Sequence, residues 1–210
     1  MNTEIITQPG SVQEALTLFF SYAVMAILAQ NAVFTRALGV SRLVQLVGDE
    51  RTNSVLFGIL QCITQFLLAP LAWYVGGQAA ALGLGPAFRP LVYLACIAVV
   101  SLLEMAVLFW VKLPWQRQLL RILPLACLNS CVLGTLLLSR TQSFSLIQAM
   151  GFGLGSGIGY LVAVLLVTEA QNRLRSQSIP AAFRGMPITL VYIGVLALAI
   201  YGLTGHTVIL

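Results

Sequence analysis

Six stretches of the chain are long, apolar and almost without charge, and this pattern limits the possible folds more than any other feature. Each stretch is close to the roughly 20 residues that an α-helix needs to cross the hydrocarbon core of a bilayer. The runs lack the alternation of apolar and polar residues that marks a membrane-spanning β-strand, which excludes a β-barrel. The pattern therefore predicts an all-α integral membrane protein with six transmembrane helices. The predicted spans cover residues 14–35, 54–75, 90–111, 120–138, 145–168 and 186–204.

The composition excludes the other fold classes. Hydrophobic residues make up 59% of the 210 residues and charged residues only 8%, whereas a soluble domain carries about 25% charged residues. A soluble globule, a disordered chain, a coiled coil and a disulfide scaffold are therefore excluded. The first apolar run does not read as a signal peptide, because Glu4 and Glu14 flank it where basic residues would be expected.

The basic residues are distributed by loop. Nine of the eleven follow the first, third and fifth spans, and neither end of the chain carries a Lys or Arg. Positively charged loops face the cytoplasm, so the odd-numbered loops are predicted to lie inside and both termini outside. The net charge of +5 is then explained by the orientation of the chain in the membrane, and no nucleic-acid partner is expected. The nine residues are Arg36, Arg42, Arg51, Lys112, Arg117, Arg121, Arg173, Arg175 and Arg184.

The two halves of the chain share a short pattern. Asn31 precedes a Leu-Gly pair that ends at Gly39, and Asn129 precedes another that ends at Gly134. Three spans per half would give the halves opposite orientations, as in transporters built from inverted repeats. The repeats would cover about 14–111 and 120–204 within a single membrane domain, 1–210. The Asn-to-Leu spacings differ, so a chance similarity is the alternative.

Three polar side chains stand out in the apolar spans. Asn31 and Asn129 are costly in lipid unless bonded, and the glycines near them permit a broken helix that could line an ion site near the midplane. The alternative is that both amides only join helices. Glu104 is the one acid well inside a span, which suggests an ion ligand or proton relay. A carboxylate paired with Lys112, about two turns away, is the alternative.

Glycines in the fifth span indicate close helix packing. Gly151, Gly155 and Gly159 repeat at every fourth position, the spacing that lets two helix backbones approach. The contact could be within the fold or with a neighbouring chain of an assembly.

Two of the four cysteines, Cys127 and Cys131, lie four residues apart on one helix face. Thiolates suit zinc, copper or an iron–sulfur cluster, but two cannot complete a four-ligand site, and small apolar packing is the alternative. His206 stands alone. No set of residues for hydrolytic catalysis is recognisable.

Several segments resemble the Rnf/Nqr family of membrane subunits. The match runs in order along nearly the whole chain and includes the Pro-x-x-Phe-Arg-Gly sequence that ends at Gly185. The matching segments are residues 30–42, 103–105, 123–134, 179–188 and 196–202.

The resemblance implies a fold and a function. Members have six helices in two inverted three-helix repeats, with broken helices in spans one and four. Two such subunits pair pseudo-symmetrically in a redox-driven pump of the bacterial inner membrane, which couples electron transfer to Na⁺ or H⁺ transport. An iron–sulfur cluster lies between them, held by one cysteine from each broken helix. This chain would be at most one component of that translocase, without a catalytic set of its own.

The chain departs from the family at the cluster positions. Ser41 and Ser130 stand where the family has cysteine, and serine is a poor cluster ligand. Cys127 or Cys131 could act as a shifted ligand, although one helical position turns a side chain by about 100°. A shared cluster is therefore doubtful. The alternatives to an Rnf-like role are a small transporter or channel without electron transfer, or a purely structural subunit.

Overall fold

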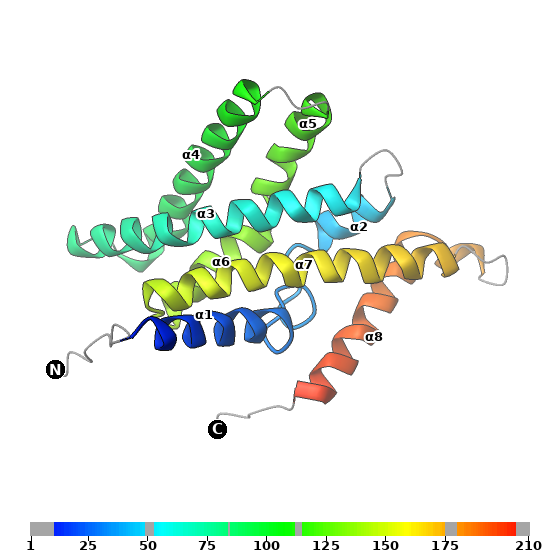
Figure 1. Cartoon of the computed structure of the whole chain (residues 1–210). Helices are drawn as coiled ribbons and strands as arrows, with labels where there is room; N and C mark the ends of the chain where they lie inside the picture. Colours follow the sequence, from blue (N-terminus) through cyan, green and yellow to red (C-terminus); the bar gives the residue numbers. More distant parts are fainter. Residues whose placement is uncertain (1–10, 49–52, 84, 112–114, 175–179, 205–210) are drawn as a thin grey trace.

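The computed structural model describes residues 11–48, 53–83, 85–111, 115–174 and 180–204. In these residues the fold is all-α, with two short 3₁₀ turns and no strand (Figure 1). The helices are α1 (Val12–Ile27), α2 (Val40–Gly48), α3 (Ser54–Ala81), α4 (Arg89–Trp110), α5 (Gln116–Cys127), α6 (Ser130–Thr141), α7 (Leu146–Leu174) and α8 (Met186–Thr204). The 3₁₀ turns are η1 (Pro86–Phe88) and η2 (Ala181–Phe183).

Four of these helices, α3, α4, α7 and α8, are long and apolar enough to cross a membrane. A fifth span is present if α5 and α6, which are bent by 46° at a short break, count as one. The prediction of broken helices is thus met in span four by an observed break. Helices α3 and α7 run six residues past their predicted ends, to Ala81 and Leu174.

The predicted first span, 14–35, is wrong beyond Ile27. Helix α1 has 16 residues and ends there, and the chain then turns until α2 begins at Val40. Ala37 and Gly39 have positive φ values of 54° and 76°, which an α-helix does not contain. Apolar composition alone could not reveal this interruption.

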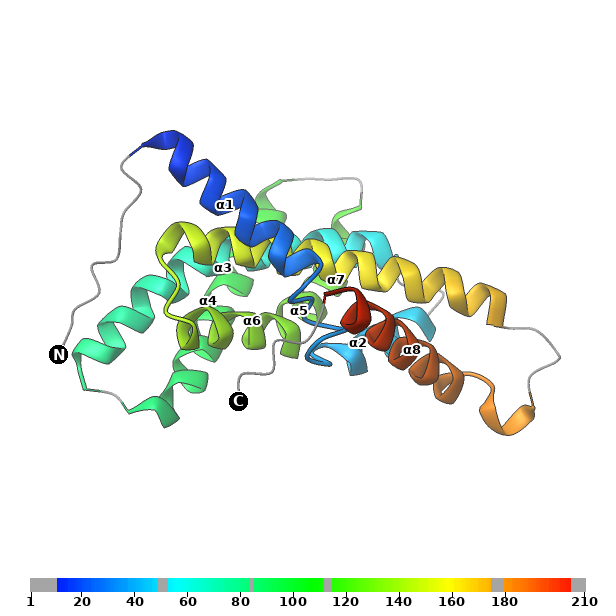
Figure 2. The same cartoon turned by 90° about the horizontal axis from the view of Figure 1, so that it is seen from below.

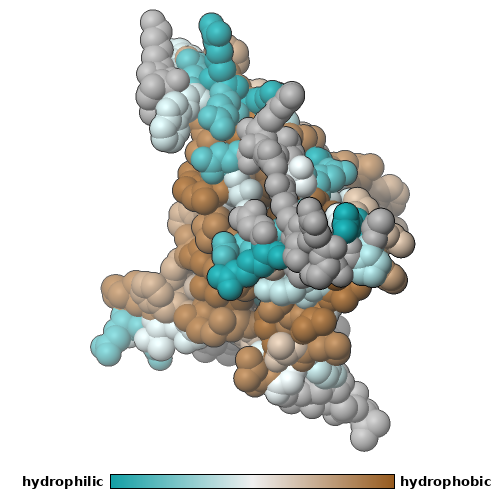
Figure 3. Space-filling view, turned by 90° about the vertical axis from the view of Figure 1, so that its right-hand side faces the viewer, coloured by the Kyte–Doolittle hydropathy of each residue, from teal (hydrophilic) through white to brown (hydrophobic). Residues whose placement is uncertain are grey.

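Helices α3 and α7 lie side by side along the centre of the molecule, and α1 packs on α7 (Figure 1). Helices α4 and α5 pack on α3 and splay away from it, while α8 diverges from the other helices at the far end of α7 (Figures 1 and 2). Only Thr189 and Ile193 of α8 are buried. Figure 3 looks along α3 and α7 from the right-hand side of Figure 1, and apolar and hydrophilic side chains are mixed over that end of the molecule.

Glycines on two sides of α7 make the central packing possible. A Cβ atom added to Gly151 or Gly155 would collide with the backbone carbonyl oxygen of Phe19 or Ala23 in α1. On the other side, a Cβ on Gly157 would lie 2.7 Å from the Cα of Cys62 in α3. The glycine stripe therefore serves contacts within this chain, between α7 and both of its neighbours.

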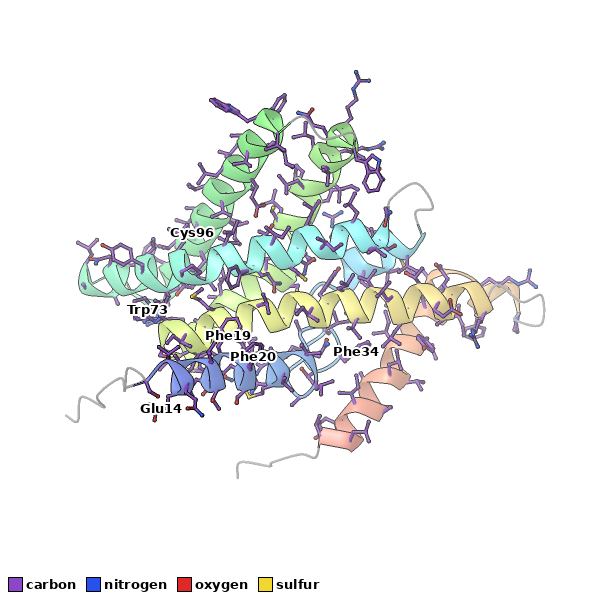
Figure 4. All side chains as sticks on the ribbon, viewed as in Figure 1. Glu14, Phe19, Phe20, Phe34, Trp73 and Cys96 are labelled. Carbon is purple, nitrogen blue, oxygen red and sulfur yellow. The ribbon has the colours of Figure 1, made fainter. Side chains whose placement is uncertain are left out.

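An aromatic cluster closes one end of the bundle. The Trp73 indole N–H donates a hydrogen bond of 3.1 Å to the carbonyl oxygen of Phe144 (Trp73 is labelled in Figure 4). The Phe144 ring meets the rings of Tyr22 and Phe152 edge to face. This cluster ties α1, α3 and the start of α7 together.

We expect Gly155→Ala to destabilise the fold by about 1–3 kcal/mol, because the new methyl group meets backbone that no rotamer change can move. Gly77→Ala in α3 is the matched control, since no atom lies within 4 Å of its added Cβ. The control should be neutral or more stable by up to about 1 kcal/mol. Unfolding in detergent measures both variants, and equal midpoints would contradict the packing argument.

Candidate functional site

The break in span four is built around Asn129. Helix α5 ends at Cys127, and Asn129 is the N-cap of α6. Its side-chain oxygen accepts a hydrogen bond of 3.2 Å from the N–H of Cys131, and its amide donates one of 2.9 Å to Oε1 of Gln61 in α3. The Asn129 side chain thus pairs one of the free backbone N–H groups at the start of α6. It also attaches that helix start to α3.

The break after α1 is built around Asn31 in a similar way. Its side-chain oxygen accepts hydrogen bonds from the N–H groups of Val33 (3.0 Å) and Phe34 (3.3 Å). Its amide donates to the carbonyl oxygens of Ile27 (2.9 Å) and Gly159 in α7 (3.1 Å). Asn31 is 2% exposed, so both ends of this amide are used inside the protein.

The two breaks contact each other directly. The N–H of Gly39 donates to Oγ of Ser130 (3.0 Å), and the hydroxyl of Tyr160 donates to the carbonyl oxygen of Gly39 (3.2 Å). Leu38 packs on Gly134, where an added Cβ would lie 2.5 Å from its side chain. The two Leu-Gly pairs singled out in the sequence therefore meet in the fold.

Glu104 lies among α3, α4 and α5. Its Oε2 atom accepts hydrogen bonds from Oγ1 of Thr64 (2.9 Å) and Sγ of Cys127 (3.3 Å). Its Oε1 atom is shielded and has no partner among the described residues, and no ion pair there involves this carboxyl group. Lys112, the expected partner, lies outside the described residues, as do Arg51, Arg175 and His206.

Further buried polar groups continue from this point to α7. Nε2 of Gln65 donates to Sγ of Cys131 (3.4 Å), and the hydroxyls of Thr135 and Ser156 are 2.8 Å apart. With the groups around Glu104 and Asn129 they form a polar layer through the apolar bundle. The polar layer consists of Gln61, Thr64, Gln65, Glu104, Cys127, Asn129, Cys131, Thr135 and Ser156.

The polar layer contains two of the three predicted polar candidates, Glu104 and Asn129. They are joined through α3, where Gln61 and Thr64 lie nearly one turn apart. Asn31 is bonded to α7 instead. Gln61, Thr64 and Gln65 were not among the predicted site residues, although their i, i+3, i+4 spacing inside an apolar span places them on one helix face.

Ser41 and Ser130, which stand where the family resemblance places cluster ligands, differ in exposure from the nearest cysteines. Ser41 and Ser130 are exposed, whereas Cys127 and Cys131 are fully buried and bonded within the polar layer. Both thiols are shielded from the molecular surface, which both serine residues reach. The donor set at that surface therefore does not fit an iron–sulfur cluster, and the described residues contain no group of three metal-ligating side chains.

Asn129→Ala should destabilise the protein more than Asn53→Ala does. Both changes remove an N-cap, which costs about 1 kcal/mol. Asn129→Ala also leaves the buried Oε1 of Gln61 without a donor, at a further cost of about 1–3 kcal/mol. Comparing the two unfolding free energies in detergent checks this, and equal losses would mean that the Gln61 contact contributes nothing.

Comparisons with known proteins identify the family of the chain. The family model described as "Rnf-Nqr subunit, membrane protein" matches residues 19–207. The chain is 31% identical over 193 residues to a protein of Edwardsiella ictaluri, and the match covers 90% of this chain and 98% of that protein. It is 29% identical over 192 residues to a protein of Pseudoalteromonas atlantica, and that match also covers 90% of this chain and 98% of the relative. It is 42% identical over 83 residues to one of Syntrophotalea carbinolica (40% and 43%). All three relatives are named as the A subunit of an ion-translocating oxidoreductase complex. The chain belongs to the Rnf-Nqr family of membrane-protein subunits.

Proposed function

We propose that the chain is the A-type membrane subunit of an ion-translocating electron-transport complex, and that its own part is to carry Na⁺ or H⁺. Family membership and the names of its nearly full-length relatives support the assignment to a complex. The observation that carries the ion role is the half-buried carboxyl group of Glu104 at one end of the polar layer.

The surroundings of Glu104 support a mobile cation. An ionised carboxylate inside a membrane protein is costly unless a positive charge or several donors compensate it. Thr64 and Cys127 supply a hydroxyl and a thiol, both neutral donors, and both bind the same oxygen atom. A proton or Na⁺ that binds at the carboxyl group would neutralise it, and a site that is only partly compensated can release its ion again.

Asn31 and Asn129 would hold the two breaks in this pathway. Broken helices in transporters present backbone carbonyl groups and helix ends to the transported ion. The hydrogen bonds of the two amides keep those ends in place without using charged groups. Their role in the pathway would then be to shape it, while Glu104 binds the ion.

We further propose that the chain forms six spans in two inverted repeats, about 14–111 and 120–204, with α1 and α2 as the broken first span. The bonds of the two asparagines support this. Asn31 bonds to the middle span of the second half at Gly159, and Asn129 bonds to the middle span of the first half at Gln61. Gln61 precedes Gly159 by the same number of residues as Asn31 precedes Asn129.

The location and the partners follow from the same proposal. The distribution of Lys and Arg supports both termini on the outer side of the bacterial inner membrane. The partners would be membrane lipid, the other components of the complex and, among these, a pseudo-symmetric sister subunit. Because serines occupy the family's ligand positions, we propose that no iron–sulfur cluster is held at Ser41 and Ser130, and that electrons pass through the complex elsewhere.

Glu104→Gln should slow cation transport by the purified complex in liposomes by roughly tenfold or more, which corresponds to losing about 1.4 kcal/mol of interaction with the ion. The amide keeps the shape of the side chain but not its charge. Glu169→Gln is the control, because Glu169 is exposed and its ion pair with Arg173 lies far along α7. Unchanged transport by the Glu104 variant, in a complex that remains assembled, would refute the ion role.

Cys127→Ser and Cys131→Ser should leave the iron and acid-labile sulfide of the complex unchanged. Both thiols are buried in the polar layer, so neither is placed to hold a shared cluster. Chemical analysis and an electron paramagnetic resonance spectrum of the purified complex measure the result. Loss of a cluster in either variant would show that a shifted cysteine has replaced the family's ligand.

A further inference from the structure

Arg89 and Arg140 are the two basic residues that the orientation of the chain does not explain. They follow the second and fourth predicted spans, in loops predicted to lie on the side opposite the other nine. In the fold Arg89 is the first residue of α4, and Arg140 lies in the last turn of α6. Helices α4 and α6 pack together, so the fold brings these two distant positions of the sequence to the same end of the bundle.

Both arginines lie beside Tyr93. A small cavity is lined by Arg89, Tyr93 and residues of α3 that include Gly76. A second cavity is lined by Arg140, Tyr93 and residues that include Trp73. Each has a volume of about 10 Å³, which is room for about one oxygen atom or water molecule. Both guanidinium charges are close enough to the hydroxyl group of Tyr93 to act on it electrostatically.

The polar groups at these cavities are donors without an acceptor. Tyr93 is 1% exposed, and its hydroxyl lies 2.7 Å from the position of a Cβ added to Gly76. This hydroxyl has no hydrogen-bond partner in the part of the chain that the structure describes. The side chains of Arg89 and Arg140 are half-buried and form no hydrogen bond or ion pair with the described residues. Guanidinium groups only donate, and leaving such groups unpaired at a membrane protein is costly, so the site fits an anion.

The surroundings favour a lipid phosphate as that anion. Trp73, labelled in Figure 4, and Tyr93 belong to the residue types that gather at the head-group level of a membrane. Leu91 and Leu94 follow Arg89 along α4 and are 68% and 50% exposed, so acyl chains can lie against them. A phosphate group offers the acceptors that guanidinium groups bind best. A free phosphate would match the charges but not the apolar surface beside them.

We propose that Arg89, Arg140 and Tyr93 bind the phosphate group of an anionic phospholipid in the leaflet at this end of the bundle. The two guanidinium groups compensate its negative charge, and the hydroxyl of Tyr93 donates a hydrogen bond to one of its oxygen atoms at the cavity beside Gly76. The site goes beyond the proposed ion transport and is separate from it. Glu104 lies fifteen residues further along α4, which is about 22 Å.

Native mass spectrometry of the purified full chain in detergent tests this inference, with phosphatidylglycerol or phosphatidylcholine added at equal concentrations. We expect the native chain to prefer phosphatidylglycerol. Arg89→Gln with Arg140→Gln should weaken that binding about thirtyfold, or about 2 kcal/mol for two basic side chains. Arg117→Gln with Arg121→Gln is the control, because it removes the same charge from exposed positions on α5 and should leave the preference unchanged. Tyr93→Phe, which keeps the ring, should weaken the binding about tenfold.

Equal binding of the two lipids by the native chain would overturn the inference, as would an equal loss in the control or full binding by the Arg89 and Arg140 double variant. Inorganic phosphate in excess should not displace phosphatidylglycerol, and displacement would mean that the site takes a free anion instead. In the assembled complex, loss of another subunit from the double variant without loss of lipid would assign the arginines to a carboxylate of that subunit. None of these measurements depends on cation transport, so the proposed function and this lipid site can fail separately.

Discussion

The structure depends on satisfying broken helix ends that lie inside the helix bundle. A helix that ends inside a bilayer exposes backbone N–H and carbonyl groups, and each one left unpaired costs several kcal/mol. Asn31 and Asn129 meet this requirement with one side chain each, since the carbonyl oxygen of the side chain binds the following backbone while its amide binds another span. The same bonds that permit the breaks therefore also fix the helices around them.

The fold also depends on the close packing of α7 against α1 and α3. The bond from Asn31 to the carbonyl oxygen of Gly159 forms only because α1 lies against a helix face without Cβ atoms at Gly151 and Gly155. On the opposite face, Gly157 brings α3 near enough for the polar groups of α3 and α7 to meet through Cys131. Small residues and polar contacts thus act together, as is usual where helices associate in lipid.

The sequence predicted the helical class and most of the spans, because hydropathy records what each segment must bury or expose to lipid. Hydropathy alone extended the first span to residue 35, and only the nearby glycines and the family resemblance indicated a break in it. The end of α1 at Ile27 depends on the bonds of Asn31 and on positive φ values that hydropathy does not record. It also missed the polar layer, because Gln61, Thr64 and Gln65 share one face of α3 but meet their polar partners only when α4, α5 and α6 pack against that face. Glu104 was found because a lone acid in a span is conspicuous by itself.

Ser130, which stands where the family resemblance places a cluster ligand, has a role in the fold. The hydroxyl of Ser130 accepts the N–H of Gly39 at 3.0 Å and so links the two breaks. A thiol in its place would be a weaker acceptor with a longer bond. Cys127 and Cys131 cannot take over a surface role, because both donate to or accept from groups of the polar layer. Ser130 is exposed, whereas its neighbours Asn129 and Cys131 are buried and bonded within the polar layer, so the residue at position 130 can differ without removing the contacts of that layer.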